Sequence, residues 1–162
     1  MDDKQKLEEK IGEALGLEMA AQKAVEEFES KGLLNDHGMK GRLESMKKEA
    51  NNHQIQIEQL VQSLSKSREL DHSRIQSKAN ETENKISQMM KIYVGDQADS
   101  SEAVEFLCFA EGGEVTHYEI LNAMAKKVKD RKFSTRIRTI LKEEQRHLKL
   151  CTRLAKQSII NE

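Results

Sequence analysis

Proline and tryptophan are absent from the chain, and aromatic residues make up only 4% of it. Strands favour aromatic and β-branched residues, whereas this sequence is rich in glutamate, lysine, glutamine, alanine, leucine and methionine, which favour helices. The absences therefore argue against a sheet protein and predict an all-α fold. The 162 residues fit a single domain, 1–162, that is large enough to bury a core.

Cysteine is also scarce, since Cys108 and Cys151 are the only two. They form neither a C-x-x-C motif nor a disulfide framework, and both fall in apolar runs, so we expect buried free thiols in a reducing compartment. No stretch approaches the roughly 18 apolar residues of a membrane span, and the N-terminus is polar. These features predict a cytoplasmic protein without a membrane partner.

Charge is balanced overall but unevenly distributed. Residues 1–122 hold 15 lysine or arginine residues against 24 acidic ones, whereas residues 123–162 hold 12 against 4. We interpret the basic last quarter as complementary to an acidic partner helix or subunit, in keeping with an expected homodimer. Binding of phosphates is the alternative; nucleic acid is not expected, because neither aromatic interleaving nor a known motif accompanies the charge.

Apolar residues recur at spacings of three and four, the period of a helix with one buried face. This pattern predicts four long helices, over about 4–31, 39–64, 101–129 and 133–154. The first two and the last two would form antiparallel hairpins with short turns near residues 35 and 131. A polar loop or frayed connection over 63–73 and an additional helix over about 75–93 would lie in a long crossover, 65–100.

Glutamate and histidine replace apolar residues on the predicted buried face of all four long helices. Helices joined by a short turn bring together residues equally far from that turn. Glu18 lies 17 residues before the first turn and His53 lies 18 after it, and the later residues are similarly spaced about the second turn. We therefore expect one polar level in the bundle, formed by Glu18, Glu49, His53, Glu114, His117, Glu144 and His147.

Four unpaired carboxylates and three imidazoles would be costly to bury in an apolar bundle. Divalent cations would offset that cost, and carboxylate oxygen with imidazole nitrogen suits Fe, Mn or Zn. Two neighbouring ions need bridging as well as terminal carboxylates, and the predicted level contains enough of both. Without metal, the same residues would form a salt-bridged network that fixes the register of the helices.

Two hairpins, a long crossover and inward Glu-x-x-His motifs resemble the ferritin-like di-iron carboxylate superfamily. The segment Thr116-His117-Tyr118-Glu119-Ile120 is similar to the H-Y-E-I segment of the YciE- and YciF-like bacterial stress proteins in that superfamily. Glu111-x-x-Glu114 resembles the paired glutamates on the third helix of rubrerythrins. The resemblance covers residues 5–157 and implies a ferritin-like four-helix bundle with an extra helix in the crossover.

Carried over to this sequence, the resemblance implies metal ligands from each of the four long helices. These are Glu18 on the first, Glu49 and His53 on the second, Glu114 on the third, and Glu144 and His147 on the fourth. The second helix departs from the usual pattern because it has Glu-x-x-x-His. His117 is an addition, either a ligand itself or a donor that orients a carboxylate. Glu111 and Glu119 are alternate ligands. Tyr118 would lie near the metals and gate electron transfer, or be a core residue.

The function implied is that of a di-iron or di-manganese oxidoreductase with two ions per chain. It would oxidise Fe(II) with oxygen or peroxide, or remove peroxide, under oxidative or metal stress, with an electron donor that the sequence does not identify. The alternative is a non-enzymatic helical stress or interaction protein with a buried polar network and no metal.

Gly112-Gly113 would permit a kink, a π-bulge or close helix approach beside the site.

Overall fold

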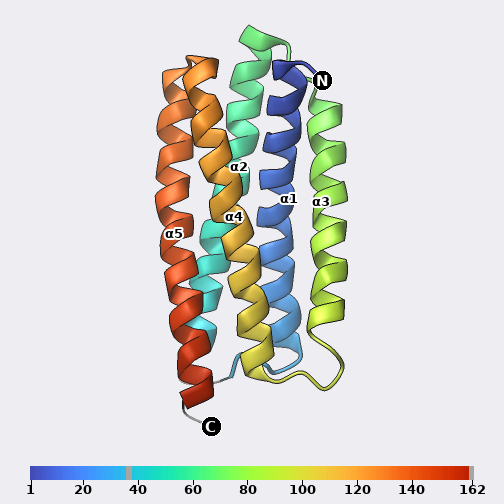
Figure 1. Ribbon diagram of the computed structural model, residues 1–162, viewed down its shortest axis with the longest axis vertical. Helices are drawn as coiled ribbons and strands as arrows, with labels where there is room; N and C mark the ends of the chain where they lie inside the picture. Colours follow the sequence, from blue (N-terminus) through green and yellow to red (C-terminus); the bar gives the residue numbers. More distant parts are fainter. Residues whose placement is uncertain (36–37, 161–162) are drawn as a thin grey trace.

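The computed structural model describes residues 1–35 and 38–160, which form five helices and no strand. Figure 1 shows them in chain order: α1 (Asp3–Ser30), α2 (Met39–Arg68), α3 (His72–Tyr93), α4 (Ser100–Val128) and α5 (Arg131–Ile160). The predicted all-α fold is confirmed. Over the described residues, none of the helices combines the length and the apolar character that crossing a membrane requires.

Helices α1, α2, α4 and α5 form a bundle in which every pair of neighbours is antiparallel (Figure 1). This arrangement depends on α3, which packs on the outer side of α1 and carries the chain back along the length of the bundle (Figure 1). α4 can therefore start at the same end as α2. The predicted hairpins and the additional helix in the crossover are thus present.

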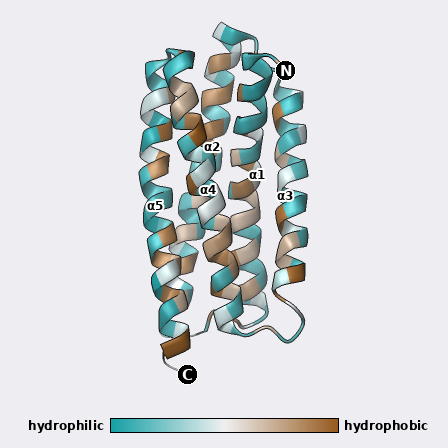
Figure 2. Cartoon of the chain, viewed as in Figure 1, coloured by the Kyte–Doolittle hydropathy of each residue, from teal (hydrophilic) through white to brown (hydrophobic). Residues whose placement is uncertain are grey.

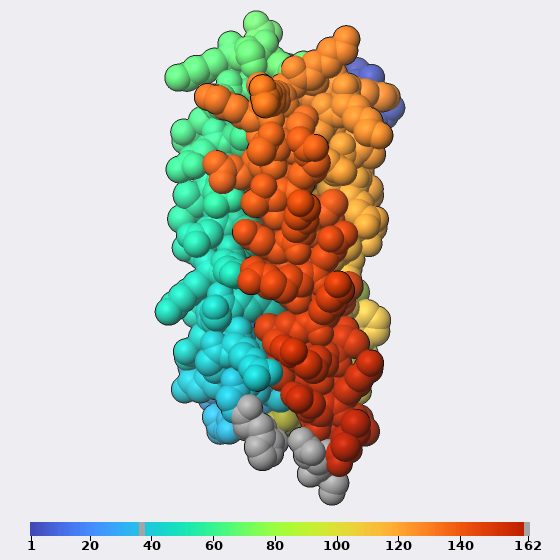
Figure 3. All heavy atoms as spheres, turned by 90° about the vertical axis from the view of Figure 1, so that its left-hand side faces the viewer, coloured from blue at the N-terminus to red at the C-terminus, as the bar shows by residue number. Residues whose placement is uncertain are grey.

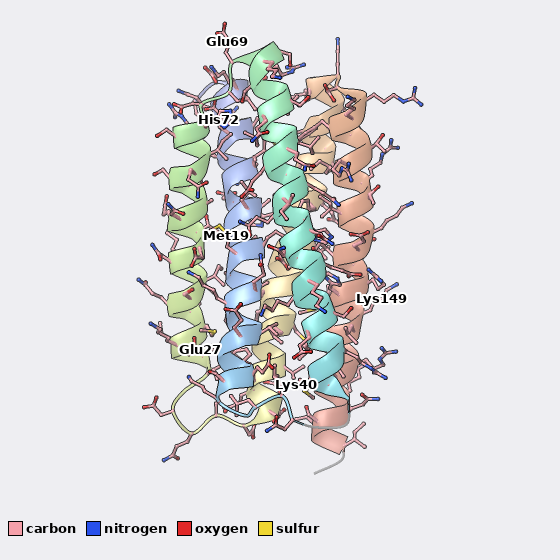
Figure 4. All side chains as sticks on the ribbon, turned by 180° about the vertical axis from the view of Figure 1, so that it is seen from behind. Met19, Glu27, Lys40, Glu69, His72 and Lys149 are labelled. Atoms are coloured by element: carbon pink, nitrogen blue, oxygen red, sulfur yellow. The ribbon has the colours of Figure 1, made fainter. Side chains whose placement is uncertain are left out.

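The largest differences from the sequence-based boundaries lie in residues 63–73 and at the end of α5, which continues to Ile160. The expected loop over 63–73 is mostly helical, because α2 continues to Arg68 and only residues 69–71 separate it from α3. Figure 4 shows Glu69 and His72 on either side of this short connection. Glu69 ends α2 in the left-handed conformation, with φ of 52°. The polar composition of 63–73 predicted a loop, but lysine and arginine also favour exposed helical turns. The predicted turn near residue 35 includes Asp36 and His37, which lie outside the described residues.

The apolar core consists of two clusters separated by a polar layer. One cluster gathers around Ile11, Leu121 and Ile137, and the other around Phe28, Leu43 and Leu107. On each bundle helix the polar residues lie between segments that belong to the two clusters. In Figure 2 hydrophilic and hydrophobic residues are interspersed along each helix, as expected when only one face of a helix is buried.

Glycine allows α1 and α3 to approach closely. A Cβ atom at Gly16 would lie 2.5 Å from the carbonyl oxygen of Ala79 and 2.6 Å from Cβ of Thr82. A Cβ atom at Gly12 would lie 2.7 Å from the carbonyl oxygen of Ile75. Such separations are too short for carbon, so any side chain at these positions would force α3 away from α1.

We expect Gly16→Ala to destabilise the protein by about 1–3 kcal/mol, the usual cost of overpacking, although alanine favours helix by about 1 kcal/mol over glycine. The matched control is Gly41→Ala on α2, where an added Cβ meets nothing within 4 Å, and which should be neutral or stabilising. Urea unfolding of the two variants measures the difference. Equal midpoints for Gly16→Ala and Gly41→Ala would contradict the close approach of α1 and α3.

Gly112 and Gly113 do not have the role expected of them. α4 is an unbroken α-helix from Ser100 to Val128, without a π-turn. A Cβ atom at Gly112 would meet nothing within 4 Å, and one at Gly113 would make an ordinary contact of 3.6 Å with Leu17. The predicted π-bulge is therefore wrong, and these glycines permit no close helix approach.

Candidate metal centre

The polar layer contains four glutamates and two histidines that are almost completely buried. Glu144 and Glu18 are 0% exposed, Glu111 and Glu114 1%, His53 1% and His147 3%. α1 contributes one of these residues, α2 one, α4 two and α5 two. Apolar clusters above and below separate the layer from water at the ends of the bundle, so its charges interact in a medium of low dielectric constant.

Glu18, His53 and Glu144 form the first group. Nδ1 of His53 lies 3.1 Å from Oε1 of Glu18 and 2.5 Å from Oε1 of Glu144. On the other side of Glu18, the hydroxyl of Tyr118 donates a 2.7 Å hydrogen bond to Oε1. One potential ligand atom from each member of the group lies within 4.8 Å of the others.

Glu111, Glu144 and His147 form the second group. Nδ1 of His147 lies 3.3 Å from Oε2 of Glu144 and 3.6 Å from Oε2 of Glu111. These three residues also offer ligand atoms within 4.8 Å of one another. Glu144 thus belongs to both groups, with Oε1 toward His53 and Oε2 toward His147. This is the arrangement that a carboxylate bridging two ions would need.

Both histidines point Nδ1 into the layer and Nε2 outward to a second carboxylate. Nε2 of His53 lies 2.5 Å from Oε2 of Glu143, and Nε2 of His147 contacts Oε2 of Glu49. The guanidinium of Arg146 in turn donates to both oxygens of Glu49, at 2.8 and 2.9 Å. An outer carboxylate that accepts from Nε2 holds the ring in place and leaves Nδ1 free to bind an ion.

The layer strongly shifts the pKa values of its members. Burial and the nearby Glu144 carboxylate raise the pKa of Glu18 to about 8, and burial raises that of Glu111 to about 7. Burial and the neighbouring Glu111 also raise the pKa of Glu114 well above its usual value. Desolvation therefore favours the neutral acid at three of the four carboxyl groups.

The histidines and Glu144 shift in the opposite sense, toward their charged forms. Burial opposes this, but Glu144 and Glu18 raise the pKa of His53 to about 11, and Glu111 and Glu144 raise that of His147 to about 10. The two imidazoles lower the pKa of Glu144. Without metal, these shifts favour a Glu144 carboxylate between two imidazolium ions and, below about pH 7, neutral carboxyl groups around it.

The residues present fit two divalent cations. Five buried carboxylate oxygens have no hydrogen-bond partner: Glu18 Oε2, Glu111 Oε2, Glu114 Oε1 and both oxygens of Glu144. The oxygens of Glu144 are close to imidazole nitrogens, but the geometry is not that of hydrogen bonds. Buried oxygens without donors are costly. Four ionised carboxylates would neutralise two divalent ions, with each histidine as a neutral ligand.

The structure brings together five of the seven predicted ligands: Glu18, His53, Glu114, Glu144 and His147. The alternate ligand Glu111 lies in the second group. Glu49 lies outside the layer, where it contacts Nε2 of the layer residue His147. Sequence reasoning missed Glu143, whose proximity to His53 depends on how α2 and α5 pack.

His117 and Glu119 lie apart from the layer. Nδ1 of His117 is 2.8 Å from the carbonyl oxygen of Gly113, and Nε2 is 3.2 Å from Oε2 of Glu13. Glu119 is exposed. The buried face of α4 passes through Glu111, Glu114 and Tyr118, so the predicted face was rotated around the helix. In this geometry His117 neither enters the layer nor orients a carboxylate of it.

Comparisons of the chain with known protein families, with curated proteins and with solved structures found no match. The function is therefore inferred from the layer itself.

Proposed function

We propose that the polar layer is a dinuclear metal centre. One ion would be held by Glu18, His53 and Glu144, and the other by Glu111, His147 and the second oxygen of Glu144. Glu114, buried in the same layer with a free oxygen, would complete the set. The observation that carries the proposal is that the two oxygens of one carboxylate, Glu144, face two separate histidines.

The donor set favours Fe or Mn, because carboxylate-rich sites with imidazole nitrogen suit these ions. Four carboxylates and two histidines on four helices also make up the ligand set of the ferritin-like di-iron carboxylate proteins, which the sequence resembles. The distribution differs, because in this layer only α5 has Glu-x-x-His, while α2 contributes His53 alone and α4 contributes two glutamates. Such a centre supplies redox chemistry: oxidation of Fe(II) by oxygen or peroxide, or removal of peroxide. We propose this class of activity for the protein, in the setting of oxidative or metal stress.

The surrounding residues would prepare the site for this chemistry. Glu143 and Glu49 accept hydrogen bonds from Nε2 and so keep Nδ1 of each imidazole directed inward. Burial raises the pKa of Tyr118, so its hydroxyl stays protonated and donates to Glu18. The apolar clusters exclude water from both ends of the site. Loading with metal requires the imidazolium and carboxylic acid protons to leave.

The alternative is a structural role without metal. The ion pair between the imidazolium form of His53 and the carboxylate of Glu144, together with the contact of His53 with Glu18, would fix the register of α1, α2 and α5. Buried polar groups can specify one arrangement of helices in this way. Pairing with the histidines would still leave one buried oxygen each of Glu18, Glu111 and Glu114 without a donor, which favours the metal centre over this alternative.

Metal analysis tests the proposal. Protein purified without chelator, or stripped and then titrated anaerobically with Fe(II), should bind about two ions per chain. Added oxygen or peroxide should then oxidise the bound Fe(II) faster than Fe(II) in buffer. Less than about half an ion per chain, with an unchanged melting temperature on adding Fe(II) or Mn(II), would support the structural alternative.

The role of Tyr118 gives a separate prediction. Tyr118→Phe removes the hydrogen bond to Glu18, and loss of such an outer partner typically lowers metal affinity about 10- to 100-fold. The stoichiometry should stay at two ions, since no ligand is lost. The control is Tyr93→Phe, whose hydroxyl bonds Glu105 on the surface. Equal affinities for the two variants, in competition with a chromogenic chelator, would show that Tyr118 is only a core residue.

A further inference from the structure

A groove on the surface between α2 and α5 reaches the polar layer from the side. It has a volume of about 470 Å³, and its walls include Met46, Leu150 and the two layer contacts Glu49 and His147. Figure 3 shows this face, where the side chains of α2 and α5 lie next to each other. These two helices are packed less closely than the other neighbours in the bundle, which leaves space for the groove.

Cations surround the groove. Arg146, Lys149 and Arg153 follow one another on α5 at spacings of three and four, so they share one helix face, and Arg42 faces them from α2. Figure 4 shows Lys149 on α5. Arg146 is ion-paired with Glu49. Within the described part of the chain, Arg42, Lys149 and Arg153 form no salt bridge. Among the described residues, three cations without a salt bridge thus lie beside one ion pair.

We propose that this groove binds a small oxyanion, phosphate or a phosphate ester, beside the polar layer. Guanidinium groups present paired donors that match the oxygens of phosphate, and three of the four cations are arginines. A concave wall with a net positive charge, here four cations against Glu49, also concentrates anions. A second hollow of about 510 Å³ shares Lys149 and Arg153 and adds Lys156, so there is room for the organic part of an ester.

The groove differs from an ordinary basic surface in its connection to buried residues. Arg146 holds Glu49, and Glu49 contacts Nε2 of His147 in the second group. An anion on Arg146 would compete with Glu49 for the guanidinium and so act on the partner of His147. The basic residues near the α4–α5 turn, such as Lys129 and Arg136, lie outside the groove.

The test is calorimetric titration of metal-free full-length protein, in low-salt buffer without phosphate, with inorganic phosphate and separately with glycerol 3-phosphate. We expect saturable binding of one anion, weakened about tenfold by Arg42→Ala and by Arg153→Ala, because a charge-assisted hydrogen bond is lost. The control Arg138→Ala removes the same charge from an exposed position of α5 and should change the affinity less than twofold. Thermal unfolding verifies that each variant is folded.

An ester that binds at least tenfold more tightly than phosphate would identify an organic phosphate as the ligand, and equal affinities would identify free phosphate. Equal losses in Arg42→Ala and Arg138→Ala, or no saturable binding, would overturn the inference. So would tighter, strongly salt-dependent binding of a short DNA duplex that Arg138→Ala weakens equally. Because the titration uses metal-free protein, its result is independent of the metal analysis. Either proposal can therefore fail while the other is supported.

Discussion

Glu144→Gln is expected to reduce the metal content from about two ions per chain to less than about 0.3. Glu144 is the one residue common to both groups, so neutralising it removes a charged ligand from both ions. Glu18→Gln and Glu111→Gln each affect a single group and should leave about one ion. Elemental analysis after Fe(II) or Mn(II) loading and desalting measures the number of ions per chain in the unmodified protein and in each variant.

The pattern has a matched control in Glu83→Gln. Glu83 is also buried, at 7% exposed, but it lies on α3 and pairs with Lys23 outside the layer, so this variant should retain two ions. Glutamine preserves the volume of glutamate, and thermal unfolding shows whether each variant is folded. Equal metal content for Glu144→Gln and Glu18→Gln would contradict the bridging role of Glu144.

The metal-free protein should lose stability as the pH rises from 6 to 9. The pKa values of His53 and His147 are raised from 6.5 to about 11 and about 10, so their stabilising effect is complete below pH 6.5 and is lost as pH rises toward those values. Glu18 and Glu111, raised from 4.5 to about 8 and about 7, act in the same direction. The lowered pKa of Glu144 matters only in acid.

Each proton that the folded state holds in excess changes stability by about 1.4 kcal/mol per pH unit. For a chain of this size, that corresponds to about 3–6 °C in Tm per pH unit. Differential scanning fluorimetry of chelator-treated protein, in buffers of matched ionic strength, provides the measurement.

Metal should reverse this dependence. Its ligands bind as carboxylates and neutral imidazoles, so affinity increases with pH, and an ion at 100 times its Kd adds about 2.7 kcal/mol of stability. Loaded protein should therefore gain most over metal-free protein at pH 8 to 9. A metal-free Tm that is constant or rises over pH 6 to 9 would contradict the protonation state inferred for the layer.

Helical periodicity was sufficient to predict the fold class and the approximate helices, because one buried face per helix leaves a regular apolar pattern. It also placed Glu18, His53, Glu144 and His147 at one level, since distance from a short turn determines height in an antiparallel hairpin. It failed at the C-terminal end of α2, where exposed polar residues continue the helix to Arg68. Local composition there does not distinguish an exposed helical turn from a loop.

The choice between Glu111 and His117 could not be made from periodicity alone. Both lie three residues from Glu114, on opposite sides, and each is about 60° away from it around the helix. Which one faces inward depends on the rotation of α4 against its neighbours. Tyr118 could have indicated the rotation of α4, because an aromatic side chain four residues after Glu114 favours the buried face. A face that contains Glu114 and Tyr118 also contains Glu111, and Tyr118 is fully buried in the structure.

The polar layer between two apolar clusters has a consequence for motion. Each bundle helix is held by apolar packing on both sides of the layer, so the middle of the molecule can rearrange while the two ends keep the helices in place. Amide hydrogen exchange should therefore be slowest within the two clusters and faster at the layer in metal-free protein. Ions in the layer would join the two halves into one cooperative unit, and the difference in exchange would disappear.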